Sequence, residues 1–289
     1  MPGHPHSLRR TAAGMARLMR LSNSLPAATL VLLGGYLAAG LPLARDTWLA
    51  AGAMACLTAF GYVSNDLHDV AEDRVNKPDR PLPSGAVKVS AARLLARLLA
   101  AAALALSAWI GVHALLAALA VLALLVYYNT RLKSTPAVGN VTVAGLAAST
   151  LAVGSIAALG LTPAAFAPVW APAVVLGLFI AAREMLKTME DVNGDRAAGR
   201  RTLATVYGAD RTARWVTAAA AAAVAASLLA YTRLGYSPIY LAVILAGVDA
   251  PLIYTAASLR RNRRPEQIGR GLALLKGSYF AGIAALWLA

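Results

Sequence analysis

The sequence predicts an all-α integral membrane protein, and three observations support this prediction. Of its 289 residues, 59% are hydrophobic and only 14% are charged, whereas an average soluble domain carries about a quarter charged residues. The apolar residues gather in blocks that approach the ~20 residues a helix needs to cross a bilayer. Nearly all of the 27 basic side chains lie between these blocks.

Nine apolar segments follow one another along the chain, and we expect each to be a membrane-spanning helix. They lie at Ser24–Ala44, Thr47–Ser64, Leu94–Ile110, Ala114–Thr130, Val138–Gly160, Pro163–Met189, Ala213–Tyr231, Ser237–Leu259 and Gly271–Ala289. Their content of Ala, Gly and Leu is typical of intramembrane helices that pack closely. We expect one membrane domain over residues 1–289, beginning with a cytoplasmic segment at 1–20.

The connections between these segments alternate in charge. Residues 1–20, 65–97, 131–137, 183–214 and 260–270 hold 24 of the 27 Lys and Arg. The short connections hold only Arg45 and Arg233, and the last segment holds Lys276. The positive-inside rule therefore predicts a cell-membrane protein with a cytoplasmic N-terminus and an external C-terminus, which agrees with an odd number of spans.

The remaining composition narrows the possible partners. The net charge of +14 does not indicate a nucleic-acid partner, because the basic residues lack the aromatic interleaving or fold motif of such domains. Cys56, the single cysteine, lies inside an apolar segment, which excludes an internal disulfide framework and a cysteine-based metal site. Membrane lipid is the expected surrounding, and no obligate protein partner is inferred.

Acidic side chains concentrate in two clusters, each at the basic end of an apolar segment. Five of the 13 lie between Asp66 and Asp79, and four between Glu184 and Asp195. If the second helix continues through the first cluster, Asn65, Asp69 and Asp73 repeat at i, i+4 and i+8, with Asp66 on the same face. Carboxylates at a helix C-terminus repel one another and the helix dipole, so a bound cation is expected.

The second cluster repeats this pattern, with Asp191 and Asp195 at i and i+4. Mg²⁺ suits both clusters, because it binds carboxylate and amide oxygens and leaves positions open for substrate phosphates. Two such sites could hold one diphosphate between metal ions. The alternative is a pair of solvated acidic loops neutralised by neighbouring arginines, but two clusters with one spacing at the same membrane face favour the metal.

These segments resemble the signatures of the UbiA superfamily of intramembrane prenyltransferases. Asn65 to Gly85 reads NDLHDVAEDRVNKPDRPLPSG, similar to the first signature of that family, and Asp191 to Gly208 reads DVNGDRAAGRRTLATVYG, similar to the second. Tyr128 to Lys133 (YNTRLK), then Gly139-Asn140, resembles its Tyr/Lys segment, and Arg20 with Asn23 its N-terminal Arg-x-x-Asn.

The resemblance implies a nine-helix bundle around a central cavity, with a cytoplasmic cap over the site. It implies Mg²⁺-dependent transfer of a prenyl group from an allylic prenyl diphosphate to a lipid-soluble acceptor through an allylic cation. The metal ligands it implies are Asn65, Asp66, Asp69, Asp73, Asp191 and Asp195. The catalytic residues it implies are Arg20, Lys77, Arg80, Tyr128 and Lys133, and the substrate-binding residues are Asn23, Lys187, Arg200 and Arg201.

Two positions depart from the family pattern. Thr188 follows Lys187 where members often carry Asp, and Ala204 follows the Thr-Leu pair where Pro is common. The first departure, Thr188, concerns the second metal site, because it replaces a carboxylate by a hydroxyl there. The stretch from Lys187 to Asp195 looks nearest to members that prenylate geranylgeranylglyceryl phosphate, while members acting on aromatic quinone precursors such as 4-hydroxybenzoate remain an alternative.

The sequence is also compatible with other functions. The same clusters would serve a UbiA-like terpene cyclase that needs no acceptor. A transporter or membrane scaffold is a further alternative, although its site would be expected at the bilayer midplane. Asp249 and Lys276, in the eighth and ninth segments, are costly in a membrane unless they face a cavity or each other, so we expect either an ion pair or a role in acceptor binding.

Overall fold

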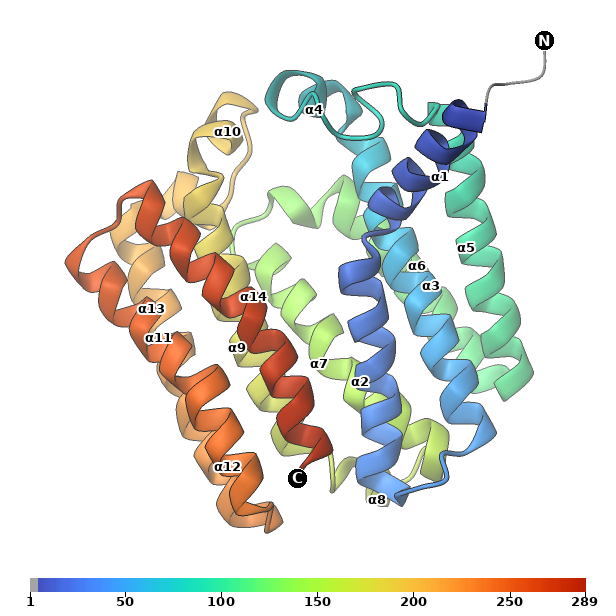
Figure 1. The fold of residues 1–289 in the computed structure, drawn as a ribbon, viewed down its shortest axis with the longest axis vertical. Coiled ribbons are helices and arrows are strands. Elements are labelled where there is room, and N and C mark those ends of the chain that lie inside the picture. Colours follow the sequence, from blue (N-terminus) through green and yellow to red (C-terminus); the bar gives the residue numbers. More distant parts are fainter. Residues whose placement is uncertain (1–4) are drawn as a thin grey trace. The chain divides into compact units, whose positions relative to one another are not determined.

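The computed structural model describes residues 5–289, apart from the side chains of residues 5–10, 75 and 76. The described chain is helical and contains no strand (Figure 1). It divides into two compact units, residues 1–29 with 45–131 and residues 30–44 with 132–289. The first boundary falls within one helix, after Thr29, and each unit is described by itself.

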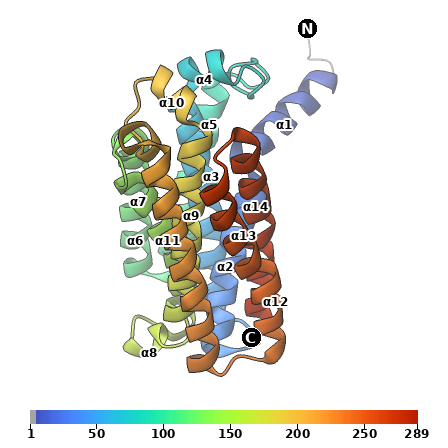
Figure 2. The same cartoon turned by 90° about the vertical axis from the view of Figure 1, so that its left-hand side faces the viewer.

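Unit 1 is built from helices that precede Arg131. Its elements are α1 (Pro5–Met19), the first part of α2 (Leu21–Ala39), α3 (Arg45–His68), α4 (Val70–Asn76), α5 (Val89–Ile110) and α6 (Val112–Thr130). α3 packs along α5 and α6, and small core residues such as Ala96 and Ala103 sit at these contacts. The short helix α4 follows α3 at one end of the unit (Figures 1 and 2).

Unit 2 contains the rest of α2 and the helices after Arg131. Its further elements are a 3₁₀ turn η1 (Leu132–Ser134), α7 (Val138–Leu159), α8 (Pro163–Phe166), α9 (Trp170–Glu190), α10 (Val192–Ala197), α11 (Leu203–Leu234), α12 (Pro238–Ile244), a π-helical turn η2 (Leu245–Asp249), α13 (Ala250–Arg261) and α14 (Pro265–Trp287). α9 packs between α7 and α11, and α10 caps the end of α9 (Figure 2).

Glycines allow α2 and α7 to approach closely within unit 2. A Cβ added at Gly154 of α7 would overlap the carbonyl oxygen of Val31, and one added at Gly34 of α2 would overlap that of Leu151. Close approach at small residues is how helices gain contact in lipid, where burial of apolar surface provides no driving force.

Seven helical segments are long and apolar enough to cross a membrane. They are Leu21–Ala39, Arg45–His68, Val89–Ile110, Val112–Thr130, Val138–Leu159, Leu203–Leu234 and Pro238–Arg261. The chain is therefore an integral membrane protein by length and composition of its helices. Of the nine predicted spans, the remaining two correspond to α9 and α14, which have 21 and 23 residues but carry internal charges such as Arg183, Glu184 and Lys276.

Several predicted boundaries needed correction. The first predicted span ends at Ala39 and not at Ala44, because the chain turns at Gly40 with φ +70°. The third begins at Val89, five residues earlier than predicted. The eighth is interrupted by the π-helical turn at Leu245–Asp249, and α11 changes direction at Gly208, where φ is +79°.

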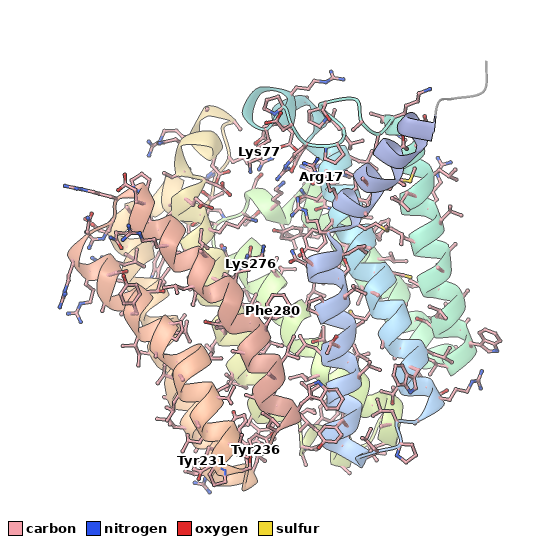
Figure 3. The ribbon with its side chains drawn as sticks, viewed as in Figure 1. Arg17, Lys77, Tyr231, Tyr236, Lys276 and Phe280 are labelled. Carbon is pink, nitrogen blue, oxygen red and sulfur yellow. The ribbon has the colours of Figure 1, made fainter. Side chains whose placement is uncertain are left out.

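The intramembrane charges also differ from expectation. Asp249 is 1% exposed, and its Oδ2 accepts a 2.7 Å hydrogen bond from Ser227 of α11. Lys276 is exposed on α14 (Figure 3). The predicted Asp249–Lys276 ion pair is therefore wrong, because a neighbouring hydroxyl and not an ammonium group bonds Oδ2, while Oδ1 has no hydrogen-bond partner among the described residues.

Candidate functional site

The first acidic cluster is built around a break between two helices of unit 1. α3 ends at His68 and α4 begins at Val70, and Asp69 between them has φ −89° and ψ 2°. The helical hydrogen bonds nevertheless continue, from the Asp69 N–H to the Asn65 oxygen at 3.0 Å and from the Asp73 N–H to the Asp69 oxygen at 2.8 Å. This bridge conformation is sparsely populated and common at active sites. The expected uninterrupted helix is wrong at Asp69, although the side chains still follow on successive turns.

Two carboxylates of this cluster lie buried against arginines. Arg20 donates to Asp66 Oδ1 at 2.9 Å, and Arg80 lies 3.6 Å from the same oxygen and 2.6 Å from Asp73 Oδ2. Asp66 and Asp73 are each 5% exposed. Burial lowers the pKa of the Arg80 guanidinium, but its hydrogen bond to Asp73 and the charges of Asp66, Asp73 and Asp69 outweigh this and hold the pKa above its ordinary value.

Arg20 is itself held in place by a strained backbone and an aromatic ring. It lies between α1 and α2 with φ +45°, a left-handed conformation that non-glycine residues rarely adopt. Its guanidinium lies 4.7 Å from the ring centroid of Tyr62, and the Tyr62 hydroxyl accepts a 3.0 Å hydrogen bond from Asn23. Tyr62 was not among the predicted site residues, although its position four residues before Asp66 places both on one face of α3.

The amide and carboxylate at the helix break form a second pair. Asn65 Nδ2 donates to Asp69 Oδ2 at 2.9 Å, and both side chains are partly exposed, unlike Asp66 and Asp73. His68 is exposed, with Nδ1 2.7 Å from the Ser64 carbonyl. Lys77 is exposed after α4, and Arg17 of α1 lies toward the same end of unit 1 (Figure 3).

The second acidic cluster repeats this backbone geometry in unit 2. α9 ends at Glu190 and α10 begins at Val192, with Asp191 between them at φ −83° and ψ 1°. The Asp191 N–H donates to the Lys187 oxygen at 3.0 Å, and the Asp195 N–H donates to the Asp191 oxygen at 2.8 Å. Each cluster therefore places one aspartate at a bridge-region break, followed four residues later by a second aspartate.

Asp195 is buried and has cationic neighbours. It is 8% exposed, and Arg200 approaches its Oδ1 at 3.9 Å while the Arg200 N–H donates to its carbonyl oxygen at 2.8 Å. Burial raises the pKa of the Asp195 carboxyl above its ordinary value, and Asp191 adds to this effect, whereas the Thr202 hydroxyl and the charges of Arg200 and Lys133 oppose it.

A capping box at Thr202 begins α11, the helix that follows Asp195 in the chain. Thr202 precedes α11, its side chain accepts from the Thr205 N–H, and the Thr202 N–H donates to Thr205 Oγ1 at 2.8 Å. Thr205 Oγ1 also donates to the Arg200 oxygen at 2.9 Å. The sequence analysis missed this pair, although Thr followed by Thr three residues later is compatible with such a cap.

Lys133 belongs to the same environment and lies in η1, shortly before a strained turn at Pro136–Val138. Ala137 has φ 65° and ψ −47°, and the Val138 N–H donates to the Pro136 oxygen at 2.8 Å, which defines a γ-turn of the rare, strained kind. A Cβ added at Gly139 would lie 2.9 Å from the Leu132 oxygen. The backbone thus folds tightly around Lys133, whose charge acts on Asp195.

The remaining predicted site residues differ in their exposure. Lys187 and Arg201 are exposed in unit 2, and Tyr128 is half-buried in the last turn of α6 in unit 1. The roles of all the predicted site residues remain predictions.

The donor chemistry of the two clusters fits Mg²⁺. Within the described residues, no three His, Cys, Asp or Glu side chains converge to hold a metal by themselves. Mg²⁺ does not require such a cage, because it commonly keeps several waters and binds through one or two carboxylates and substrate phosphates. The partly exposed oxygens of Asn65, Asp69 and Asp191 are of this hard type, whereas Asp66 and Asp73 are engaged by arginines.

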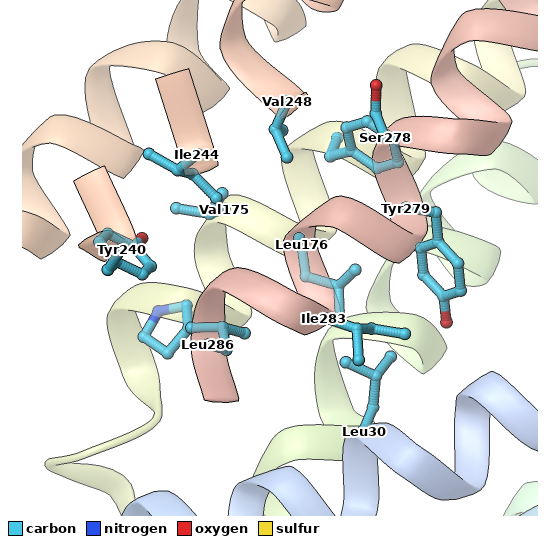
Figure 4. Close-up of a pocket in the computed structure, with 13 residues that line it drawn as sticks. Leu30, Val175, Leu176, Tyr240, Ile244, Val248, Ser278, Tyr279, Ile283 and Leu286 are labelled. Carbon is cyan, nitrogen blue, oxygen red and sulfur yellow. The ribbon is translucent and has the colours of Figure 1, made fainter. Parts of the chain in front are cut away.

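An apolar pocket lies between α9, α12, α14 and the second part of α2 in unit 2 (Figure 4). It has about 460 Å³ of empty space, counted out to the open solvent at its mouth. Its lining is apolar except at Tyr240, Ser278 and Tyr279. Such a lining accepts hydrocarbon and provides few partners for water.

Comparisons with known proteins identify the family of this chain and structures of similar fold. A model of the UbiA prenyltransferase family matches residues 27–275. The chain is 34% identical over 287 residues to the digeranylgeranylglyceryl phosphate synthase of Methanoculleus marisnigri, covering 96% of this chain and 99% of that protein. A solved structure described as digeranylgeranylglyceryl phosphate synthase in membranes is similar with a TM-score of 0.74 and 27% identity, covering 96% of this chain and 97% of that one. A UbiA homolog from Archaeoglobus fulgidus bound to GPP and Mg²⁺ shares the fold, with a TM-score of 0.68 and 21% identity over 94% of this chain and 99% of that one.

Proposed function

The chain belongs to the UbiA prenyltransferase family, and on that premise we propose that its acceptor is a prenylglyceryl phosphate lipid. The relative from Methanoculleus marisnigri, a digeranylgeranylglyceryl phosphate synthase, aligns along nearly its whole length. The reaction moves a prenyl group from an allylic prenyl diphosphate to a hydroxyl of a glyceryl phosphate that already carries one prenyl chain.

The alignment with that synthase carries the acceptor assignment, and the repeated aspartate geometry supports the metal-dependent ionisation of the donor. Asp69 and Asp191 occupy nearly identical bridge-region conformations between a long apolar helix and a short polar one. In both clusters the second aspartate, Asp73 or Asp195, is buried beside an arginine. The repeated backbone geometry and the partial exposure of these side chains support Asp69 and Asp191, with the neighbouring amide of Asn65, as ligands of Mg²⁺.

Bound Mg²⁺ would supply positive charge to the diphosphate oxygens as the carbon–oxygen bond breaks. The residues of the chain would add further positive charge and would exclude water. Arg20 and Arg80, already fixed on Asp66, and Lys133 near Asp195 present preorganised cations where negative charge develops, which stabilises a transition state most effectively. The apolar pocket would hold hydrocarbon away from water, which otherwise captures an allylic cation.

The arrangement in the membrane forms part of the proposal. α9 and α14 would cross the bilayer with the seven apolar segments, because they are 21 and 23 residues long and a helix needs about 20 residues to span it. The basic connections would face the cytoplasm. The family match runs from residue 27 to residue 275 and so crosses both units, which supports one domain, and for this domain we propose a central cavity under a cap.

The test is product analysis with a panel of acceptors. Purified enzyme in detergent receives labelled geranylgeranyl diphosphate and Mg²⁺, with geranylgeranylglyceryl phosphate, with 4-hydroxybenzoate, or with no acceptor. Labelled digeranylgeranylglyceryl phosphate formed only with the first acceptor supports the proposal. A prenylated aromatic product contradicts the acceptor assignment, and a cyclised hydrocarbon or alcohol formed without acceptor identifies a terpene cyclase.

A further inference from the structure

A groove rimmed by arginines runs between α11 and α13 in unit 2. Ala213, Arg214 and Thr217 line it from α11, and Leu259, Arg260 and Arg263 line it from α13 and the turn that follows. It has about 690 Å³ of empty space, counted out to the open solvent at its mouth. Its floor is apolar, since Leu259 is 0% exposed and Ala213 is 4% exposed.

The charges around this groove are not balanced. Arg263 lies 3.0 Å from Asp210, but Arg214 and Arg260 have no ion-pair partner among the described residues. Asp210 is itself 73% exposed, so it neutralises little of the rim. Three guanidinium groups around one groove repel one another unless an anion lies between them.

The position of the groove along α11 matches a membrane surface. Residues 215–232 contain no charged side chain, and they separate Arg214 from Arg233. These arginines are 19 residues apart (233 − 214), or about 28 Å at 1.5 Å per residue, close to the ~30 Å hydrocarbon core of a bilayer. Arg214 and Arg233 therefore reach opposite headgroup layers.

Aromatic side chains mark the same two levels. Next to Arg214, Trp215 is partly exposed and packs against Tyr207 with ring centroids 5.2 Å apart. Tyr231 and Tyr236 lie toward the other end of α11 (Figure 3). Trp and Tyr concentrate at both membrane interfaces, so the groove opens at headgroup depth beside the apolar ends of two spans.

We propose that this groove binds the phosphate headgroup of an anionic membrane phospholipid, with its hydrocarbon chain along the apolar floor. The guanidinium groups of Arg214, Arg260 and Arg263 recognise the phosphate oxygens, for which their fork geometry is suited. Basic pockets between membrane helices bind such headgroups in general. This site uses none of the residues assigned to the diphosphate or the metal, and it stands independently of the acceptor.

The test is lipid retention on the full-length enzyme in detergent, measured by native mass spectrometry during titration with phosphatidylglycerol. In the variant Arg214→Gln/Arg260→Gln we expect affinity for the first bound lipid to fall about thirtyfold, because each arginine near an anionic headgroup contributes roughly 1 kcal/mol. The matched control Arg93→Gln/Arg97→Gln removes two exposed arginines from the first turns of α5 and should change affinity less than about twofold.

Three outcomes would overturn the proposal. If both double variants lose the same affinity for phosphatidylglycerol, the attraction is a general effect of charge. If the enzyme retains phosphatidylcholine as well as it retains phosphatidylglycerol, the groove does not recognise the net charge of the headgroup. Displacement of the lipid by millimolar inorganic phosphate would identify a site for soluble phosphate. The variant Arg214→Lys/Arg260→Lys keeps the charge and is expected to recover part of the affinity, with thermal unfolding curves verifying that every variant is folded.

Discussion

Asp69 and Asp191 each occupy a sparsely populated backbone conformation at the point where a long apolar helix gives way to a short polar one. The helical hydrogen bonds on either side of each break persist, and both side chains are partly exposed. The same solution occurs twice in the chain. Residues with such backbone geometry are concentrated at functional sites, which favours these two aspartates among the predicted ligands.

Asp69→Ala is expected to lower the prenyl transfer rate at least about 100-fold, because a lost charge-stabilising group in an active site typically costs this much. Rate against Mg²⁺ concentration is the measurement, and His68→Ala is the matched control, since His68 is the exposed neighbour. A rate in Asp69→Ala equal to that of the control would remove Asp69 from the metal site.

Arg80→Ala is expected to destabilise the enzyme by about 2–4 kcal/mol, because it leaves the buried carboxylates of Asp73 and Asp66 without their shared cation. Thermal unfolding in detergent, combined with Asp73→Asn and the double variant, measures the coupling between the two side chains. Additive effects of the two substitutions would contradict the pairing seen at 2.6 Å.

At the residue scale, the sequence predicted which side chains lie near one another in the first cluster, but not which of them pair with arginines. Asn65, Asp66, Asp69 and Asp73 were all expected to be ligands, because spacing alone places them on one helical face. The pairing of Asp66 and Asp73 with Arg20 and Arg80 depends on contacts across 46 and 7 positions of sequence. Helical periodicity carries no information about such contacts.

At the element scale, the apolar segments predicted most helices well, because length and hydrophobicity determine them. The irregular points were missed. The bend at Gly208 and the π-helical turn ending at Asp249 lie inside sequences whose composition does not differ from that of a regular helix. A glycine within a helix is compatible with both a bend and close packing, so sequence alone cannot distinguish them.

The crossing of α2 and α7 provides a test at this scale. Gly154→Ala is expected to destabilise the enzyme by about 1–3 kcal/mol, because the added methyl meets the Val31 backbone, which cannot rotate away. Gly145→Ala, on the same helix with open space around the added Cβ, is the matched control and should not lower the thermal unfolding temperature. Equal behaviour of the two variants would contradict the close approach.

At the scale of the whole molecule, composition and charge asymmetry predicted an integral membrane protein, and the motifs predicted its family. Both predictions are confirmed. Nine spans were expected and seven segments meet the criteria of length and hydropathy. Of the other two, α9 combines an apolar span with Arg183, Glu184 and Lys187, which lead into the second cluster, and α14 carries Glu266, Arg270 and Lys276. A helix that serves the site is therefore the hardest span to recognise by hydropathy.

The acceptor belongs to this scale as well, because its recognition depends on side chains from many helices and no short motif encodes it. The sequence from Lys187 to Asp195 favoured a glyceryl phosphate acceptor, and this prediction agrees with the name of the relative. Chain length of the donor likewise depends on cavity depth. These properties require product analysis and cannot be obtained from motifs.

The central claim, that paired aspartate sites use Mg²⁺ to ionise a prenyl diphosphate, is tested most directly by diphosphate release from enzyme reconstituted in liposomes with both substrates. We expect release in Mg²⁺, its loss on addition of excess EDTA, and full recovery when Mg²⁺ is restored. Diphosphate release that continues unchanged after chelation, by protein shown to be folded, would contradict the account.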